Sequence, residues 1–169
     1  MNGGPRAGFP AALRAAMPGW RPALLGSLAW GLVMAASAAF GLWSQARAAT
    51  AAAQIVLIVF AAGGFLAWAP ALLVARLVGA RRPEQRFAAF FVMLTVATLA
   101  VTGMIFALYF RYYFSQWHGA FLTLRWAFEF GFTVAAALYQ FAVLGFRLYF
   151  PLGFIALFAA AAWNARRPR

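Results

Sequence analysis

The sequence predicts an all-α fold, a bundle of helices that crosses a membrane several times. The chain has 169 residues, of which 66% are hydrophobic and 9% are charged, and its mean hydropathy is +0.83. Soluble domains are nearer half apolar and about a quarter charged. The apolar residues also form runs longer than the roughly 20 residues that cross about 30 Å of hydrocarbon. A polytopic integral membrane protein with one domain accounts for these three observations.

The first two apolar runs predict the first two spans. Residues 1–21 contain glycine, proline and three arginines and are expected to form a cytoplasmic N-terminal tail. The run 22–43 follows, with an alanine-rich triplet at Ala46–Ala48 that is typical of a signal-peptide cleavage site. Because signal-peptide cores are about 7–15 residues long, we expect an uncleaved span. The second span is predicted at 51–78, with a bend at Pro70, since proline removes a backbone donor.

The second half of the chain predicts a third span, a fourth span and a short apolar segment. A basic loop at 80–86 carries Pro83 at a position suited to the first turn of a helix. The third span is predicted at 87–110. The next apolar region would measure roughly 65 Å as one helix, so it must break, and Leu144–Gly153 is the best candidate. This leaves a fourth span at 118–147, an apolar segment at 151–163 and a basic C-terminal tail at 164–169.

The distribution of positive charge predicts the topology. All fourteen basic residues are arginine, and eleven of them lie in the two tails, at Arg76, in the 80–86 loop or at Arg147. Because arginine-rich segments stay in the cytoplasm, we expect both termini there and an even number of crossings. Four spans with 151–163 re-entrant or at the interface is the prediction. Five spans is the alternative, because about 15 apolar residues can cross a thinned bilayer.

A line of polar residues runs along the predicted fourth span. One of only two acidic residues, Glu129, lies inside this apolar stretch. At about 100° per residue the six polar side chains fall within a sector of roughly 80°, which predicts a continuous polar face directed at other helices. Near the two ends of the span, arginine side chains are expected to reach headgroups, at Arg147 on the cytoplasmic side. The six candidate site residues are His118, Arg125, Glu129, Thr133, Gln140 and Arg147.

Three interpretations of this polar face remain open. In the first it is structural and joins the fourth span to the second and third, where Thr95, Thr98 and Thr102 form a matching hydroxyl face. In the second Glu129 is a proton or cation site, paired with Arg125 four residues earlier. In the third the face contacts a partner subunit.

Composition argues against most other function classes. There is no cysteine, no aspartate and one histidine, so a catalytic triad, thiol chemistry and a metal site all lack residues, and we expect no enzyme activity, metal or cofactor. The arginines flank apolar runs, which favours the lipid bilayer and anionic headgroups over nucleic acid as partners. Small residues at four-residue spacing, including Gly31 and Gly63, are compatible with a homodimer.

The function expected from the sequence is therefore that of a small multi-pass protein of a bacterial inner membrane. The lysine-free, arginine- and alanine-rich composition favours a bacterial source. A non-catalytic accessory, stabilising or assembly component of a larger membrane complex is the main hypothesis. A small transporter or channel with Glu129 as its proton or cation site is the alternative.

Overall fold

The computed structural model describes residues 14, 16–48, 50–78 and 82–166, and within them the chain is helical with no strand. Most of the expected N-terminal tail and the end of the C-terminal tail lie outside the described residues. A π-helix, η2 (Phe141–Gly145), and a 3₁₀ turn, η3 (Phe146–Tyr149), connect the last two long helices. The long helices are α2 (Trp20–Ser44), α3 (Ala51–Leu77), α4 (Pro83–Phe114), α5 (Leu124–Gln140) and α6 (Leu152–Arg166).

The prediction of an all-helical chain with four helices long and apolar enough to cross a membrane is confirmed. The four candidate spans are Trp20–Ser44, Ala52–Leu77, Pro83–Trp117 and Leu124–Tyr149. Pro83 occupies the first turn of α4, as expected, and the Gln85 side chain accepts the Arg82 N–H at 3.4 Å. α3 continues through Pro70. The fourth span begins six residues later than predicted, because residues 118–123 form a connection.

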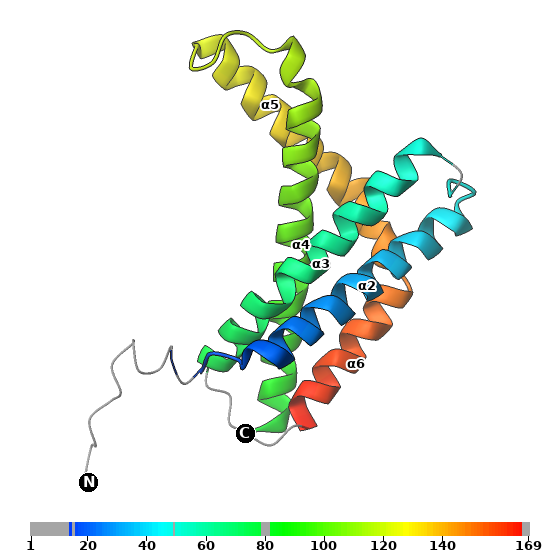
Figure 1. The fold of residues 1–169 in the computed structure, drawn as a ribbon, viewed down its shortest axis with the longest axis vertical. Helices are drawn as coiled ribbons and strands as arrows, with labels where there is room; N and C mark the ends of the chain where they lie inside the picture. The colour runs from blue at the N-terminus through cyan, green and yellow to red at the C-terminus, as the bar shows by residue number, and fades with distance from the viewer. Residues whose placement is uncertain (1–13, 15, 49, 79–81, 167–169) are drawn as a thin grey trace.

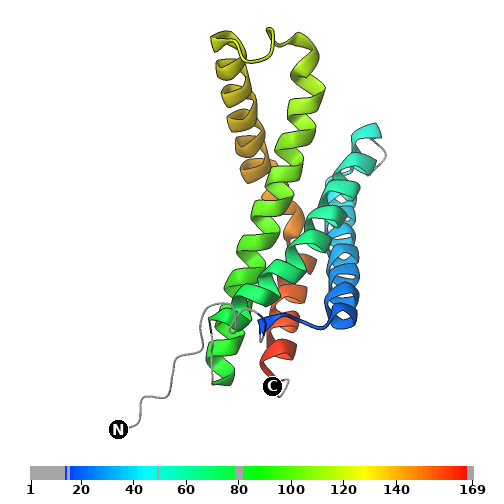
Figure 2. The same cartoon turned by 60° about the vertical axis from the view of Figure 1, so that its left-hand side comes forward.

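α4 is the central helix of the bundle (Figure 1). It packs against α3, α5 and α6, while α2 packs against α3, α6 and η3. The start of α2, the end of α3, the start of α4 and the end of α6 lie at one end of the molecule (Figure 1). We call this the arginine end, because Arg21, Arg76, Arg82, Arg86 and Arg166 lie there. At the other end the α4–α5 hairpin diverges from α2 and α3 (Figures 1 and 2).

α5 and α6 together make a single traverse of the bundle. α6 lies along the first half of α4, where the rings of Phe87 and Phe158 are 5.0 Å apart. Arg86 Nη2 at the start of α4 donates to the carbonyl of Asn164 near the end of α6 at 3.0 Å. The segment expected to be re-entrant or interfacial, 151–163, therefore continues toward the arginine end and does not fold back along α5. Over the described residues the chain thus runs along the bundle four times, through α2, α3, α4 and the pair α5 and α6.

The break between α5 and α6 leaves backbone groups that helical hydrogen bonds do not satisfy. Phe150 is extended (φ −103°, ψ 143°), and Pro151 after it has no N–H. Ser37 of α2, which is fully buried, closes the gap: its Oγ donates to the carbonyl of Leu148 at 2.8 Å and accepts the N–H of Gly153 at 3.0 Å. Because lipid offers no hydrogen bonds, an irregular segment is tolerated at membrane depth only with such partners.

Two close approaches set the packing of the first three long helices. A Cβ on Gly31 would lie 2.8 Å from the carbonyl oxygen of Ala61, so only glycine lets α2 approach α3 there. A Cβ on Gly63 would lie 2.8 Å from Cβ and 2.9 Å from Cα of Thr102, which makes the same argument for α3 and α4. Across α2 and α4, Trp30 Nε1 donates to Thr98 Oγ1 at 3.0 Å in the buried core. These contacts hold α2, α3 and α4 as one unit.

Candidate functional site

The candidate site lies at the tip of the α4–α5 hairpin, far from the arginine end (Figure 1). After α4 a 3₁₀ turn, η1 (Ser115–Trp117), ends at His118, which is extended. Leu122 has a left-handed backbone (φ 64°) and reverses the chain. Thr123 then starts α5 as its N-cap, since its Oγ1 accepts the N–H of Trp126 at 3.1 Å. The helix therefore begins after His118 and not at it.

Glu129 closes this connection from the first turns of α5. Its Oε1 accepts the Arg125 Nε at 2.8 Å, and its Oε2 accepts the backbone N–H of Gly119 at 2.7 Å. Both carboxylate oxygens are thus occupied by donors of its own chain. The Arg125 side chain is 77% exposed and that of Glu129 is 25% exposed, so the pair lies at the surface of the hairpin.

His118 joins α4 to α5 through a chain of hydrogen bonds. Arg111 Nη1 lies 2.8 Å from His118 Nδ1, and Thr133 Oγ1 lies 3.2 Å from His118 Nε2. Thr133 Oγ1 also donates to the carbonyl of Glu129 at 2.6 Å, which uses its single hydrogen. Arginine can only donate, so the neutral imidazole with hydrogen on Nε2 satisfies every bond at once. We call Arg111, His118, Arg125, Glu129, Thr133 and the Gly119 N–H the tip network.

Arg111 was missed in the sequence reasoning, although it organises the network. Its guanidinium lies 4.8 Å from the ring centre of Phe130 and 5.4 Å from that of Trp126. Cations over aromatic faces at this range are attracted to the ring quadrupole. An arginine in the middle of the aromatic sequence LYFRYYF was the available signal, but nothing in the sequence shows which rings it meets.

The structure brings four of the six predicted site residues together and leaves two apart. His118, Arg125, Glu129 and Thr133 belong to the tip network. Gln140 is exposed at the end of α5, and Arg147 is exposed in η3. Neither of these side chains forms a hydrogen bond, ion pair or cation–π contact with another described residue. The expected continuous line is interrupted because η2 and η3 change the helical period after Gln140.

The position of Arg147 differs most from expectation. It was expected at the cytoplasmic end of a span, but its neighbour Leu148 is bonded to Ser37, 17 residues after the start of α2 and seven before its end. At 1.5 Å per residue Arg147 lies about 25 Å from the arginine end of α2 and about 10 Å from the other. Arg147 therefore lies along the length of the bundle and not at its arginine end.

The polar face was expected to join this helix to the second and third spans, and it meets the third span only in part. α5 packs on α4, the third span, through Trp126, Phe130 and Ala137, and the bonds of His118 to Arg111 and Thr133 connect the same two helices. α3, the second span, is not a main contact of α5. The threonine face of α4 has another role, since Thr98 accepts Trp30 and Thr95 donates to the carbonyl of Phe91 in its own helix.

The tip network can fix the shape of the hairpin, but it offers little for chemistry. In the part of the chain that the structure describes, no three side chains of histidine, cysteine or acidic type lie together as a metal site. The single carboxylate is held by two donors, and the histidine has both nitrogens in hydrogen bonds. A structural link between α4 and α5 is what this geometry performs.

Comparison with protein-family models, with curated proteins and with solved structures found no match to this chain.

Proposed function

We propose that this protein is a non-catalytic accessory or assembly subunit of a larger complex in a bacterial inner membrane. The four apolar helices support a membrane location, and the arginines at one end support a cytoplasmic position for that end and for both termini. The partner docks on the outer half of the molecule, on α5 and the α5–α6 break. The observation that carries this proposal is the exposed, unpaired Arg147.

An arginine in the hydrocarbon region needs a partner. Charged side chains within spans face other protein or water in most membrane proteins. Arg147 faces outward and contacts no described polar group. A carboxylate or carbonyl group on a helix of the partner would satisfy the guanidinium at this depth.

α5 provides the apolar surface for the same contact. In the most apolar stretch of the span Leu124–Tyr149, which begins with α5, only 11% of the residues are buried, against 28–39% in the other three candidate spans. Three large side chains four residues apart, Leu124, Phe128 and Phe132, are exposed by 76%, 61% and 73%. At 100° per residue they point roughly 180° away from the α4 contact. A partner helix would cover this stripe.

The transporter or channel alternative is not favoured by the tip network. A carboxylate that binds a proton or cation along a path would present an oxygen to that path. Both oxygens of Glu129 instead accept hydrogen bonds, from Arg125 and from the backbone N–H of Gly119. Of the two residues expected to continue the path, Thr133 donates to the carbonyl of Glu129 and Gln140 is exposed at the end of α5. These contacts support a structural role for Glu129.

The experiment is extraction of the tagged protein from native membranes in polymer nanodiscs, followed by sizing and mass spectrometry. We expect a defined larger membrane protein to co-purify. The variants Arg147→Gln and Phe128→Ala with Phe132→Ala should each lose it. Leu25→Ala with Leu32→Ala removes a similar exposed stripe from α2 and should retain it. A protein that elutes alone, or a partner that all variants retain equally, would contradict the proposal.

A further inference from the structure

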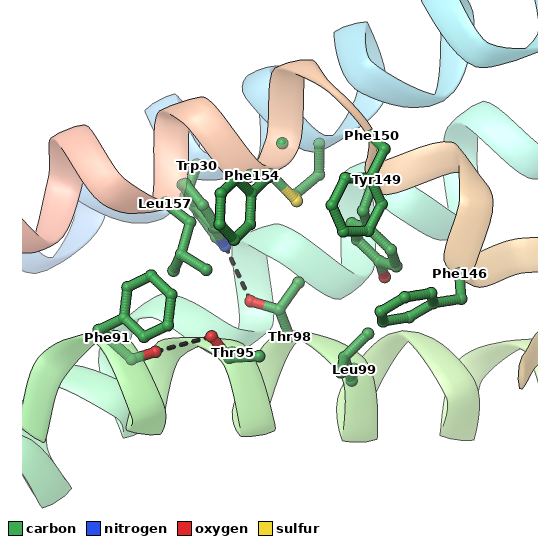
Figure 3. A pocket seen from close by; sticks show the side chains of 12 residues that line it. Trp30, Phe91, Thr95, Thr98, Leu99, Phe146, Tyr149, Phe150, Phe154 and Leu157 are labelled. Atoms are coloured by element: carbon green, nitrogen blue, oxygen red, sulfur yellow. Dashed lines mark hydrogen bonds between the residues drawn. The ribbon is translucent and has the colours of Figure 1, made fainter. Parts of the chain in front are cut away.

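An apolar cleft lies between α4 and α6, at the side of the bundle and away from the tip network. Its volume is about 180 Å³, and it is open on one side. Figure 3 shows α4 and α6 as its two walls, with Trp30 of α2 behind and the α5–α6 break closing one end. The residues that line it are Trp30, Met34, Phe91, Thr95, Thr98, Leu99, Phe146, Tyr149, Phe150, Gly153, Phe154 and Leu157.

The surface of the cleft is hydrocarbon in character. Trp30 Nε1 donates to Thr98, and Thr95 donates to the carbonyl of Phe91. The Tyr149 hydroxyl has no hydrogen-bond partner among the described residues, but it is buried and adds almost no polar surface to the cleft. Stacked rings of Phe150 and Phe154, with centres 5.6 Å apart and planes at 19°, form part of the rim. A water molecule needs two to four polar partners to occupy a cavity, and this lining supplies none to it. An apolar occupant fits the lining.

The depth of the cleft matches one leaflet of a bilayer. Phe91 is five residues and Leu99 thirteen residues beyond Arg86, so the cleft extends from about 8 Å to about 20 Å from the arginine end of α4. Half of a 30 Å hydrocarbon layer is about 15 Å. The cleft therefore begins just below the expected headgroup level and reaches past the midplane, which is the path of one acyl chain.

The helices that form the two walls also carry a cluster of positive charge below the cleft. Arg82 is the N-cap of α4, Arg86 follows one turn later, and Arg166 ends α6. The bond from Arg86 Nη2 to the carbonyl of Asn164 holds the two helix ends together, so the three arginines lie at the same end of the two walls. Anionic lipid phosphates are attracted to such juxtamembrane arginines.

We propose that the cleft binds one acyl chain of an anionic phospholipid whose phosphate lies among Arg82, Arg86 and Arg166. The α5–α6 break leaves room for this site. A helix that continued from α5 without a break would place side chains along the whole length of α4. The bound lipid fills the space between α4 and α6 and contacts both the α5–α6 break and the arginine end. The exposed stripe of α5 does not line this cleft, and the lipid site and the proposed docking surface meet only at the α5–α6 break.

Trp30 provides the probe, because it lines the cleft. Nanodiscs of phosphatidylcholine are titrated with phosphatidylglycerol brominated in its acyl chains, and in parallel with phosphatidylcholine brominated in the same way. The quenching attributed to Trp30 is the difference between the native protein and Trp30→Phe. We expect half-maximal quenching at a mole fraction of brominated anionic lipid about tenfold or more below that of the brominated phosphatidylcholine.

Two pairs of variants locate the lipid. Thr95→Phe fills the cleft and should abolish the preferential quenching, whereas Val96→Phe, at an exposed neighbouring position, should retain it. Arg82→Gln with Arg166→Gln should remove the preference for the anionic lipid over phosphatidylcholine. Arg21→Gln, at the same end on α2, should leave this preference unchanged. Equal quenching by the two brominated lipids in the native protein would overturn the proposal without reference to any variant. So would preferential quenching that persists in Thr95→Phe.

Discussion

Replacement of Ser37 by alanine tests whether its hydroxyl group stabilises the break between α5 and α6. Ser37 is fully buried in α2, and its Oγ holds two backbone groups of the break, the Leu148 carbonyl at 2.8 Å and the Gly153 N–H at 3.0 Å. Ser37→Ala removes both bonds and leaves a donor and an acceptor with no replacement nearby. The α5–α6 break should then loosen from α2.

The size of the effect follows from the two bonds. Interhelical hydrogen bonds in membrane proteins average about 0.6 kcal/mol, which gives a lower bound of about 1 kcal/mol for the pair. A buried polar group that loses its partner costs about 1–3 kcal/mol, so two orphaned backbone groups give an upper range of about 2–6 kcal/mol. We expect Ser37→Ala to lower the free energy of unfolding by about 2–4 kcal/mol.

The assay is reversible unfolding in bicelles with increasing dodecyl sulfate, followed by tryptophan fluorescence and circular dichroism. Ser27→Ala is the matched control, because Ser27 is buried in the same helix and its side chain has no hydrogen bond to a described residue. It should change the free energy by less than about 0.5 kcal/mol. If Ser37→Ala and Ser27→Ala were equally mild, Ser37 would not sustain the break and the reasoning would be refuted.

Three further predictions use matched pairs of variants. Thr98→Val removes the acceptor of Trp30 and should destabilise the protein by about 0.6–1.7 kcal/mol in the same unfolding assay, while Thr95→Val, which loses only a bond within its own helix, should be near neutral. Gly63→Ala places a methyl group against the backbone of Thr102 and should lower the free energy of unfolding by about 1–3 kcal/mol. Gly131→Ala, with open space around it, should raise the free energy of unfolding by up to about 1 kcal/mol. The reverse order of stability would contradict the packing of α3 on α4. Glu129→Ala frees the Gly119 N–H and should speed hydrogen exchange across residues 115–123. Glu84→Ala, at the exposed start of α4, should leave this exchange unchanged. Equal exchange in both variants would show that Glu129 does not stabilise the connection.

The helices could be predicted from the sequence because their signals are local. The runs 22–43 and 51–78 agree with α2 and α3 to within two residues at each end, since length and hydropathy alone define them. The break was expected within Leu144–Gly153, and the π-helix, the 3₁₀ turn and Pro151 occupy residues 141–151. Glycine, proline and arginine close together were sufficient to locate it.

The direction of α6 and the composition of the tip network depended on contacts that periodicity does not contain. The direction of 151–163 depends on contacts with residues far away in the chain, since the Gly153 N–H donates to Ser37 and Arg86 donates to the carbonyl of Asn164. His118 was assigned to a helix that in fact begins at Leu124, yet it still reaches Thr133, because the connection folds back over α5. The capping threonine, Thr123, was the local signal for the true start of that helix.

The measurement that tests the central claim most directly is photo-crosslinking in living cells from two exposed positions. Phe132→benzoylphenylalanine places the reactive ketone on the proposed docking surface of α5, and Leu32→benzoylphenylalanine places it on an equally exposed site of α2. We predict that the α5 position gives one crosslinked product with a larger membrane protein and that the α2 position does not. Crosslinks only to lipid or to a second copy of the chain from both positions would contradict the account of an accessory subunit.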